Sequence, residues 1–369
     1  MAARCGSMAC ESEDMAAKPA ARWWLELAQH AWAGACAGAF TGPGWRVVGW
    51  VAPCAGDPMT LPDVGAPAAA LAGLRELAMG DKASALLLAA QGDCRAELAR
   101  RGDAPELIWV RAGQASPVAW ADGADGWAMA QLELGSGDWL VSVSAAYPQA
   151  TGWDAERLAA AVRRWIETGT DATQLADCLI RTGQRLAQSL RSSLADAALW
   201  AARLRPLLSA TVWTGPPSDP TQDRALLEAL LAEPGTRIIC GDTTAQIAAR
   251  LLGRELVIDQ RELAQAEVPP SAQLEGVHLV TEGLITLRHA AEWLRGARTV
   301  RDLPRNVDAS TRLARHLMAV DEVRFLVGAA VNPAQVDGEA GGAPQRLAAV
   351  DELVAGLRAL GKVVLVQRY

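Results

Sequence analysis

The sequence has little of what marks several common protein classes. Of its 369 residues only two are Phe, two are Tyr and four are His. None of the four histidines lies in a Gly-x-Ser-x-Gly sequence or beside a catalytic-type cysteine, so no nucleophilic triad is predicted. The seven cysteines include no Cys-x-x-Cys pair and no histidine at zinc-ligand spacing, which argues against a zinc site and a disulfide framework.

Charge and hydrophobic runs are also limited. The net charge is −7 and no dense Lys/Arg block occurs, so a nucleic-acid partner is not expected. No run of about twenty apolar residues free of charges or turn residues is present, and the N-terminus lacks a charged start followed by an apolar core. We therefore expect no membrane partner and a cytoplasmic protein.

The length of the chain predicts two domains, because 369 residues exceed what one core usually organises. Residues 1–18 are rich in Ala, Ser and Glu and are predicted to be a disordered tail. The remaining chain changes character at Pro206, which divides it into predicted domains over residues 19–205 and 206–369.

The first predicted domain is of the α+β class. Strand-like runs at 45–52, 107–112, 127–134 and 139–144 lie too close together for helical crossovers, which favours antiparallel pairing. Helices are predicted after Asp154 and over 172–190. Twelve of the fourteen Trp precede residue 201, and scattered Trp on apolar faces indicate core positions more often than a stacking surface for a carbohydrate or nucleotide.

The second predicted domain alternates strands with helices. Strands are predicted at 210–214, 237–240, 277–280, 324–327 and 363–367, with helices at 221–232, 244–252, 286–295, 309–318 and 344–360. Such alternation requires parallel strands with crossover helices. It predicts a three-layer α/β domain with a mainly parallel sheet.

The stretch 236–250 is the most informative, because it predicts a buried strand, a tight turn and a helix N-terminus in succession. Gly241 suits an unusual backbone conformation, and Asp242 or Thr243 can cap the helix. First-turn N–H groups and the helix dipole would then favour an anion. Ordinary helix capping is the alternative interpretation. Cys240, at the end of this strand and beside the helix N-terminus, is the one cysteine placed where a thiol pKa can fall, but a small buried residue is the favoured interpretation.

Four loops follow the predicted parallel strands and should meet at one sheet edge, where ligands of α/β proteins bind. They offer hydroxyls, backbone N–H groups and two polar side chains, which suits a small anionic ligand. The alternative is that their Gly and Pro residues only form turns. The candidate ligand-binding residues are Gly215, Gly241, Asp242, Thr243, Thr244, Glu282 and Asn332.

Five segments of the second predicted domain carry a resemblance through their order and spacing: TGPPSDPTQD (214–223), GTRIICGDTTAQIAARLLGREL (235–256), VPP (268–270), EGVHLVTEGLITL (275–287) and FLVGAAVNPA (325–334). They resemble the C-terminal region of the stage II sporulation protein E family, whose members have a PPM-type metal-dependent Ser/Thr phosphatase domain. The resemblance spans about 160 residues and implies a phosphatase-like β-sandwich flanked by helices upstream. The family commonly has a second Gly where this chain has Asp242, and a carboxylate there opposes an anion.

Upstream, the resemblance places other residues where the family has metal-binding acids. Gly38 occupies the position of the acid in the family's first strand. Pro53 occupies the position of the metal-binding Asp of a DGxGxG turn, unless Asp63 fills that role. Ala145 replaces the Asp of an SDG turn. Ala195 stands at the ligand position of the DDxT strand entry, with Asp196 beside it.

The resemblance implies two divalent metals that activate a bridging water, and Mg²⁺ or Mn²⁺ needs oxygen ligands that Ala, Gly and Pro lack. We therefore expect a phosphatase-like protein that has lost catalysis and binds a phosphoprotein or a regulatory protein. One alternative is an active phosphatase with Mn²⁺ or Mg²⁺ and with Asp63 and Asp196 as catalytic and metal-binding residues. Another is a small-molecule enzyme centred on the C-terminal loops.

Overall fold

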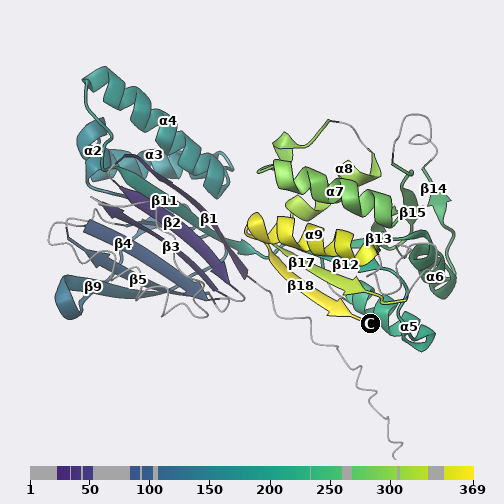
Figure 1. Cartoon of the computed structure of the whole chain (residues 1–369). Coiled ribbons are helices and arrows are strands. Elements are labelled where there is room, and N and C mark those ends of the chain that lie inside the picture. The colour runs from purple at the N-terminus through teal and green to yellow at the C-terminus, as the bar shows by residue number, and fades with distance from the viewer. Residues whose placement is uncertain are drawn as a thin grey trace, which may run out of the picture.

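The computed structural model describes residues 23–33, 35–42, 45–52, 84–91, 94–102, 107–232, 234–259, 268–305, 308–330 and 345–369. Within these residues the strands form three sheets, two of which use residues before position 207 and one of which uses residues after position 208 (Figure 1). The predicted tail at 1–18 lies outside the described residues.

The two sheets of the N-terminal half are antiparallel throughout. The five-stranded sheet has the order β1 (Trp23–Ala31), β11 (Ala198–Pro206), β10 (Trp139–Val143), β6 (Ile108–Arg111) and β7 (Gln114–Ser116). The six-stranded sheet has the order β2 (Cys36–Gly42), β3 (Trp45–Ala52), β4 (Ser84–Gln91), β5 (Arg95–Arg101), β9 (Trp127–Glu133) and β8 (Ala121–Asp122). The close spacing of strand-like runs thus correctly predicted antiparallel sheets.

Strand β11 shows how the core is layered. Its side chains alternate between two faces, and both faces are buried because a sheet lies on one side and helices lie on the other. Trp200 and Leu204 pack into the core shared with the six-stranded sheet, whereas Leu199 and Ala201 pack into the core under the helices. Trp200 is fully buried and its Nε1 donates to Leu86 O across the two sheets at 3.4 Å, which confirms the core interpretation for this Trp.

Helices α2 (Ala146–Thr151), α3 (Ala155–Glu167) and α4 (Ala172–Leu190) cover the outer face of the five-stranded sheet (Figure 1). Asp154 begins α3 by accepting from Arg157 N at 2.8 Å. Asp171 and Gln174 form a reciprocal capping box at the start of α4. These caps satisfy orphan N–H groups, so the helix starts agree with the predicted ones.

The third sheet is mixed rather than wholly parallel. Its parallel part has the order β16 (Val277–Thr281), β13 (Thr236–Cys240), β12 (Ser209–Thr214), β17 (Glu322–Val327) and β18 (Val363–Arg368). Two short strands, β14 (Val257–Ile258) and β15 (Ala272–Leu274), add antiparallel pairs beyond β16. Neither strand was predicted from the sequence, because strands of two and three residues are too short to show an alternation of apolar and polar residues.

Five helices cover the two faces of the mixed sheet (Figure 1). Helices α5 (Asp223–Ala232) and α6 (Asp242–Leu252) share one core with it. Helices α7 (Leu284–Gly296), α8 (Ala309–Met318) and α9 (Gln345–Ala359) share another. Neighbouring residues of β13 show the division, because Ile239 faces the first core and Ile238 the second. The arrangement has three layers, as predicted.

A buried ion pair joins the first and third sheets. Arg205 of β11 donates two hydrogen bonds to Asp321, at 2.6 and 2.8 Å, and its Nε lies 3.6 Å from Glu26 of β1. Asp321 also accepts from Leu208 N at 2.9 Å. The chain is therefore fixed at its passage from one sheet to the other, close to the predicted boundary at Pro206. Within the described residues, no helix is long and apolar enough to cross a membrane.

Candidate functional site

The loops after the central parallel strands enclose a cavity of about 360 Å³. In a parallel sheet all strands end at the same edge, so the loops that follow β12, β13, β16 and β17 meet there. The cavity brings together the predicted residues Gly215, Gly241, Asp242, Thr243, Thr244 and Glu282, and it is also lined by Pro216, Gly283, Leu284, Ala330 and Arg346. Asn332, the remaining predicted residue, lies outside the described residues.

The N-terminus of α6 opens into this cavity without a side-chain cap. Gly241 occupies the cap position with φ +128°, a conformation that side chains other than glycine rarely adopt, and it has no side chain to accept from the first-turn N–H groups. Thr244, three residues on, is buried, and its hydroxyl has no hydrogen-bond partner in the described part of the chain. Donors therefore gather at the positive end of a helix dipole.

The N-terminus of α7 lies beside it and is differently arranged. The Glu282 carboxylate accepts from Leu284 N at 2.9 Å, from Ile285 N at 2.9 Å and from Thr286 N at 3.2 Å. The carboxylate of Glu282 thus caps the N-terminus of α7, and this role accounts for the glutamate at this position without a ligand. Gly241 and Gly283 allow the two loops to approach closely, since a Cβ on Gly283 would lie 3.4 Å from Gly241 Cα.

Arg346, on α9, supplies the cavity with a buried cation that the sequence analysis missed. It is 7% exposed, and its Nη2 donates to Gly328 O at 2.9 Å and to Ala330 O at 3.2 Å. Its Nη1 is buried and finds no hydrogen-bond partner within the described ranges. Burial lowers the pKa of the guanidinium, because the charged form is separated from water.

The mouth of the cavity carries a negative charge. Asp242 and Thr243 are the first residues of α6 and both are exposed, whereas Thr244 behind them is buried. The carboxylate of Asp242 is favourable to the helix dipole but repels a second anion. Cys240, one residue before Gly241, is fully buried, and burial raises the pKa of its thiol to about 12. The burial of Cys240 confirms the favoured interpretation of a small buried residue over a reactive thiol.

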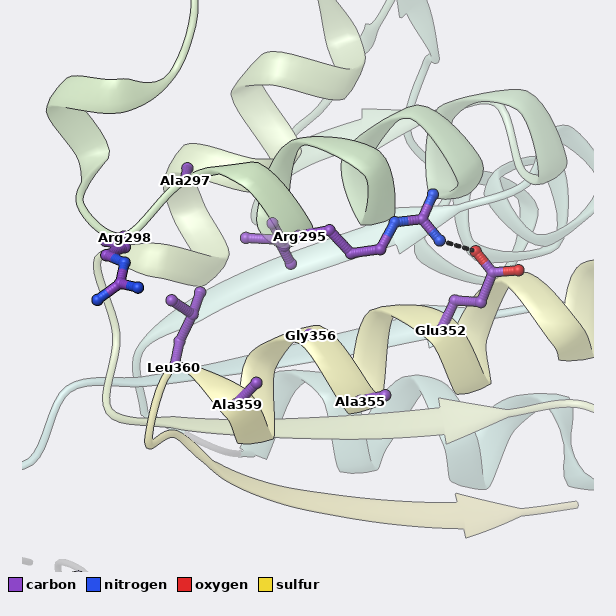
Figure 2. A pocket seen from close by; sticks show the side chains of 9 residues that line it. Arg295, Ala297, Arg298, Glu352, Ala355, Gly356, Ala359 and Leu360 are labelled. Carbon is purple, nitrogen blue, oxygen red and sulfur yellow. Dashed lines mark hydrogen bonds and ion pairs between the residues drawn. The ribbon is translucent and has the colours of Figure 1, made fainter. Parts of the chain in front are cut away.

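A larger cavity, of about 720 Å³, lies between the carboxyl-terminal ends of α7 and α9 (Figure 2). Small residues line it along α9, and Arg295 reaches across from α7 to Glu352 at 3.1 Å (Figure 2). Both partners of that ion pair are about half exposed. None of the buried side-chain atoms that lack a partner in the described residues belongs to its lining, so this cavity offers less specific chemistry than the one at the strand ends.

The positions that the phosphatase resemblance concerns lie in two adjoining turns. Ser144 directly follows β10, and its Oγ donates to Asp196 O at 3.1 Å and accepts from Ala198 N at 3.0 Å. The turn that contains Ala145 therefore contacts the turn that contains Ala195 and Asp196. Asp196 has φ +63°, which Asp tolerates better than most residues, and its N–H donates to Ala33 O at 2.8 Å.

Of the other positions that the resemblance assigns to metal ligands, the structure describes only Gly38. Gly38 lies in β2, opposite Gly49 of β3. Pro53 and Asp63 lie outside the described residues. Among the residues that the structure describes, no group of three or more His, Cys, Asp or Glu side chains is placed to hold a metal ion. In this part of the chain, Asp196 is therefore not joined by the further acids that a two-metal site requires.

No protein-family model and no curated protein sequence matches this chain. Solved structures similar to it include the phosphatase domain of the cell-fate determinant SpoIIE from Bacillus subtilis, at 15% identity over 50% of this chain and 93% of that chain, with a TM-score of 0.36. The RsbU and RsbW domains of a Mycobacterium tuberculosis protein match at 14% identity over 57% of this chain and 67% of that chain, with a TM-score of 0.36. The catalytic domain of the Ser/Thr phosphatase PstP, solved with two manganese ions, matches at 12% identity over 50% of this chain and 99% of that chain, with a TM-score of 0.32.

Proposed function

We propose that this chain is a PPM-type phosphatase-like protein that has lost hydrolysis and acts as a regulatory or binding module. One observation carries the proposal. Two turns joined through Ser144 hold Ala145 and Ala195 at the positions where the family resemblance asks for metal-binding aspartates. The motif positions are thus adjacent in space, while two of the carboxylates that would use this adjacency are missing.

The chemistry of the metals explains why these replacements matter. Mg²⁺ and Mn²⁺ take oxygen ligands, and methyl groups supply none. In a two-metal phosphatase the ions lower the pKa of a bridging water and stabilise the charge that develops during phosphoryl transfer. The described residues do not fit such a centre, because Asp196 is the only acid in the two joined turns. Loss of several kcal/mol of stabilisation, roughly two to three powers of ten or more in rate, would follow.

The competing proposal is an active phosphatase in which Asp63 and Asp196 hold displaced metals. It predicts Mn²⁺-dependent hydrolysis of a phosphoserine peptide by the unmodified chain, with loss of that hydrolysis in Asp63→Ala and Asp196→Ala. Our proposal predicts background hydrolysis in all three proteins. Folding of each variant is checked by its thermal unfolding curve, and a metal-dependent activity abolished by either substitution would replace our proposal with the competing one.

The partner is proposed to be a phosphoprotein or a regulatory protein, which this chain binds without hydrolysing a phosphate ester. Fluorescence anisotropy of a labelled phosphoserine peptide and of its unphosphorylated twin separates the two possibilities. Stronger binding of the phosphorylated peptide, with the peptide recovered intact, supports a phosphoprotein partner. Equal weak binding of both peptides favours a regulatory protein that is recognised through other contacts.

A further inference from the structure

Two buried polar groups without partners line one cavity, and they come from distant parts of the sequence. Arg346 Nη1 belongs to α9 and Thr244 Oγ1 to the first turn of α6, and neither has a hydrogen-bond partner among the residues that the structure describes. An unsatisfied buried donor is costly, so native structures contain few of them. Both groups are more than nine-tenths buried. Their gathering at the same 360 Å³ cavity indicates that a bound molecule supplies the missing acceptors.

The two helix N-termini at this cavity identify the charge of that molecule. Glu282 places a carboxylate on the first turn of α7 and accepts from three of its backbone N–H groups. At α6 the position equivalent to Glu282 is the buried Cys240, and the cap residue that follows it is Gly241, so neither supplies a carboxylate to the first turn. The N-terminus of α6 therefore has donors and a positive dipole end where α7 has its own anion, and an external anion completes it.

The charges around Arg346 support the same conclusion. Its Nη2 is bound to two carbonyl oxygens, and no ion pair with a carboxylate is found for it among the described residues. Of the two acids that line the cavity, Glu282 is engaged by α7, and Asp242 lies at the exposed mouth. A buried cation without a counter-ion is expensive, and an anion inside the cavity would offset that cost.

We propose that this cavity binds a small organic anion, whose carboxylate or phosphate group is held by Arg346 Nη1, Thr244 Oγ1 and the first-turn N–H groups of α6. The cavity has the volume of a small-metabolite site. Asp242 at the mouth faces the rest of the ligand and favours a molecule with a hydroxyl group over one with a second negative charge. The proposal is independent of whether the N-terminal half hydrolyses phosphate esters.

The test is calorimetric titration of the full chain with three probes: inorganic phosphate, glycerol 3-phosphate and malate. Binding of at least one probe at a concentration of about 10 mM or below is expected, since a few charge-assisted hydrogen bonds give affinities in the millimolar to micromolar range. Binding of glycerol 3-phosphate but not of malate means that the site recognises a phosphate group. Binding of malate but not of glycerol 3-phosphate means that it recognises a carboxylate. Failure of all three probes overturns the proposal.

Variants show whether the binding is at this cavity. Arg346→Gln should weaken binding at least about thirtyfold, because a buried charge contact is removed. Thr244→Val, which keeps the shape of the side chain, should weaken it about tenfold. Arg358→Gln, on the same helix but exposed at its other end, removes the same charge and should leave the affinity unchanged. Equal binding by all three variants would contradict the proposal.

Backbone NMR of the ¹⁵N-labelled full chain locates the bound probe on the unmodified protein, so this test does not depend on whether the Arg346 variant folds. The amide signals of Thr243 and Thr244 should shift on addition of the bound probe, because those N–H groups face the anion. Asp242→Asn should strengthen binding several-fold, since it removes a like charge from the mouth. Unmoved Thr243 and Thr244 signals, with binding retained, would place the anion elsewhere and overturn the proposal.

Discussion

The guanidinium of Arg346 lies directly against Gly215, so closely that a Cβ built on Gly215 would fall 1.2 Å from Nη1. Gly215 follows β12 and Arg346 lies on α9, which is separated from it by more than a hundred residues. The absence of a side chain at Gly215 is therefore what admits the buried cation to the cavity.

Gly215→Ala should destabilise the protein and displace Arg346. Gly215 has φ +78°, which costs an alanine about 1–2 kcal/mol, and the clash with Nη1 should add about 1–3 kcal/mol. Chemical denaturation of the variant and of the parent protein measures the sum.

Gly253→Ala is the matched control for that substitution. Gly253 has φ +63°, but a Cβ there would meet nothing within 4 Å, so only the backbone cost of about 1–2 kcal/mol is expected. Equal losses of unfolding free energy in the two variants would mean that the Arg346 side chain moves aside without an energetic cost. In that case Gly215 would not be needed to seat the cation.

The strand ends were predictable from the sequence, but the group that gives the site its charge was not. Alternation of strands and helices forces the loops at Gly215, Gly241 and Glu282 to one edge, so periodicity alone brings them together. Arg346 lies on a helix that follows the last of those loops, and its direction depends on packing. An arginine at the start of the apolar helix face that continues through Ala349, Val350 and Leu353 was the available signal.

The role of Glu282 shows a second limit of sequence reasoning. Its position after a strand suggested a ligand contact, whereas the structure gives it three backbone N–H groups of α7. Caps are usually sought as Ser, Thr, Asp or Asn at the residue before the helix. A glutamate two residues before Leu284 reaches the same groups because its side chain is longer.

Glu282 and Thr244 should therefore respond oppositely to truncation in the absence of ligand. Glu282→Ala removes a charged cap and should destabilise the protein by about 1–3 kcal/mol. Thr244→Val removes an unsatisfied buried hydroxyl and should leave stability unchanged or raise it by about 1 kcal/mol. Urea denaturation tests both, and a marked loss in Thr244→Val would mean that its hydroxyl has a partner within the protein.

The ion pair between Arg205 and Asp321 should be important for stability. Asp321 is buried, and removing one partner of a buried pair costs about 3–5 kcal/mol. Asp321→Ala should lose that amount, and limited proteolysis should cut faster near Leu208, whose N–H binds Asp321.

Asp351→Ala is the exposed counterpart. Asp351 pairs with Arg368 at 3.0 Å, but both side chains are more than half exposed, so the loss should stay below about 1 kcal/mol. Similar losses for the buried and exposed pairs would show that the Arg205 contact does not hold the sheets together.

Stability should fall as the pH falls below the ordinary histidine value of 6.5, in part because of His316. Burial, followed by the nearby charges of Arg312 and His278, lowers the pKa of His316 in the folded protein. The unfolded chain then binds the proton first, so acid favours unfolding between 6.5 and the lower folded value. His316→Gln should flatten the pH dependence of stability in this window. An unchanged slope would exclude the contribution of His316.

Metal stoichiometry tests the central claim about function most directly. Calorimetric titration of the full chain with Mn²⁺ should show no pair of specific sites, since Ala145 and Ala195 supply no ligands at the joined turns. Two Mn²⁺ per chain, bound in the micromolar range or tighter and lost in Asp196→Ala, would contradict the claim and identify an active two-metal phosphatase.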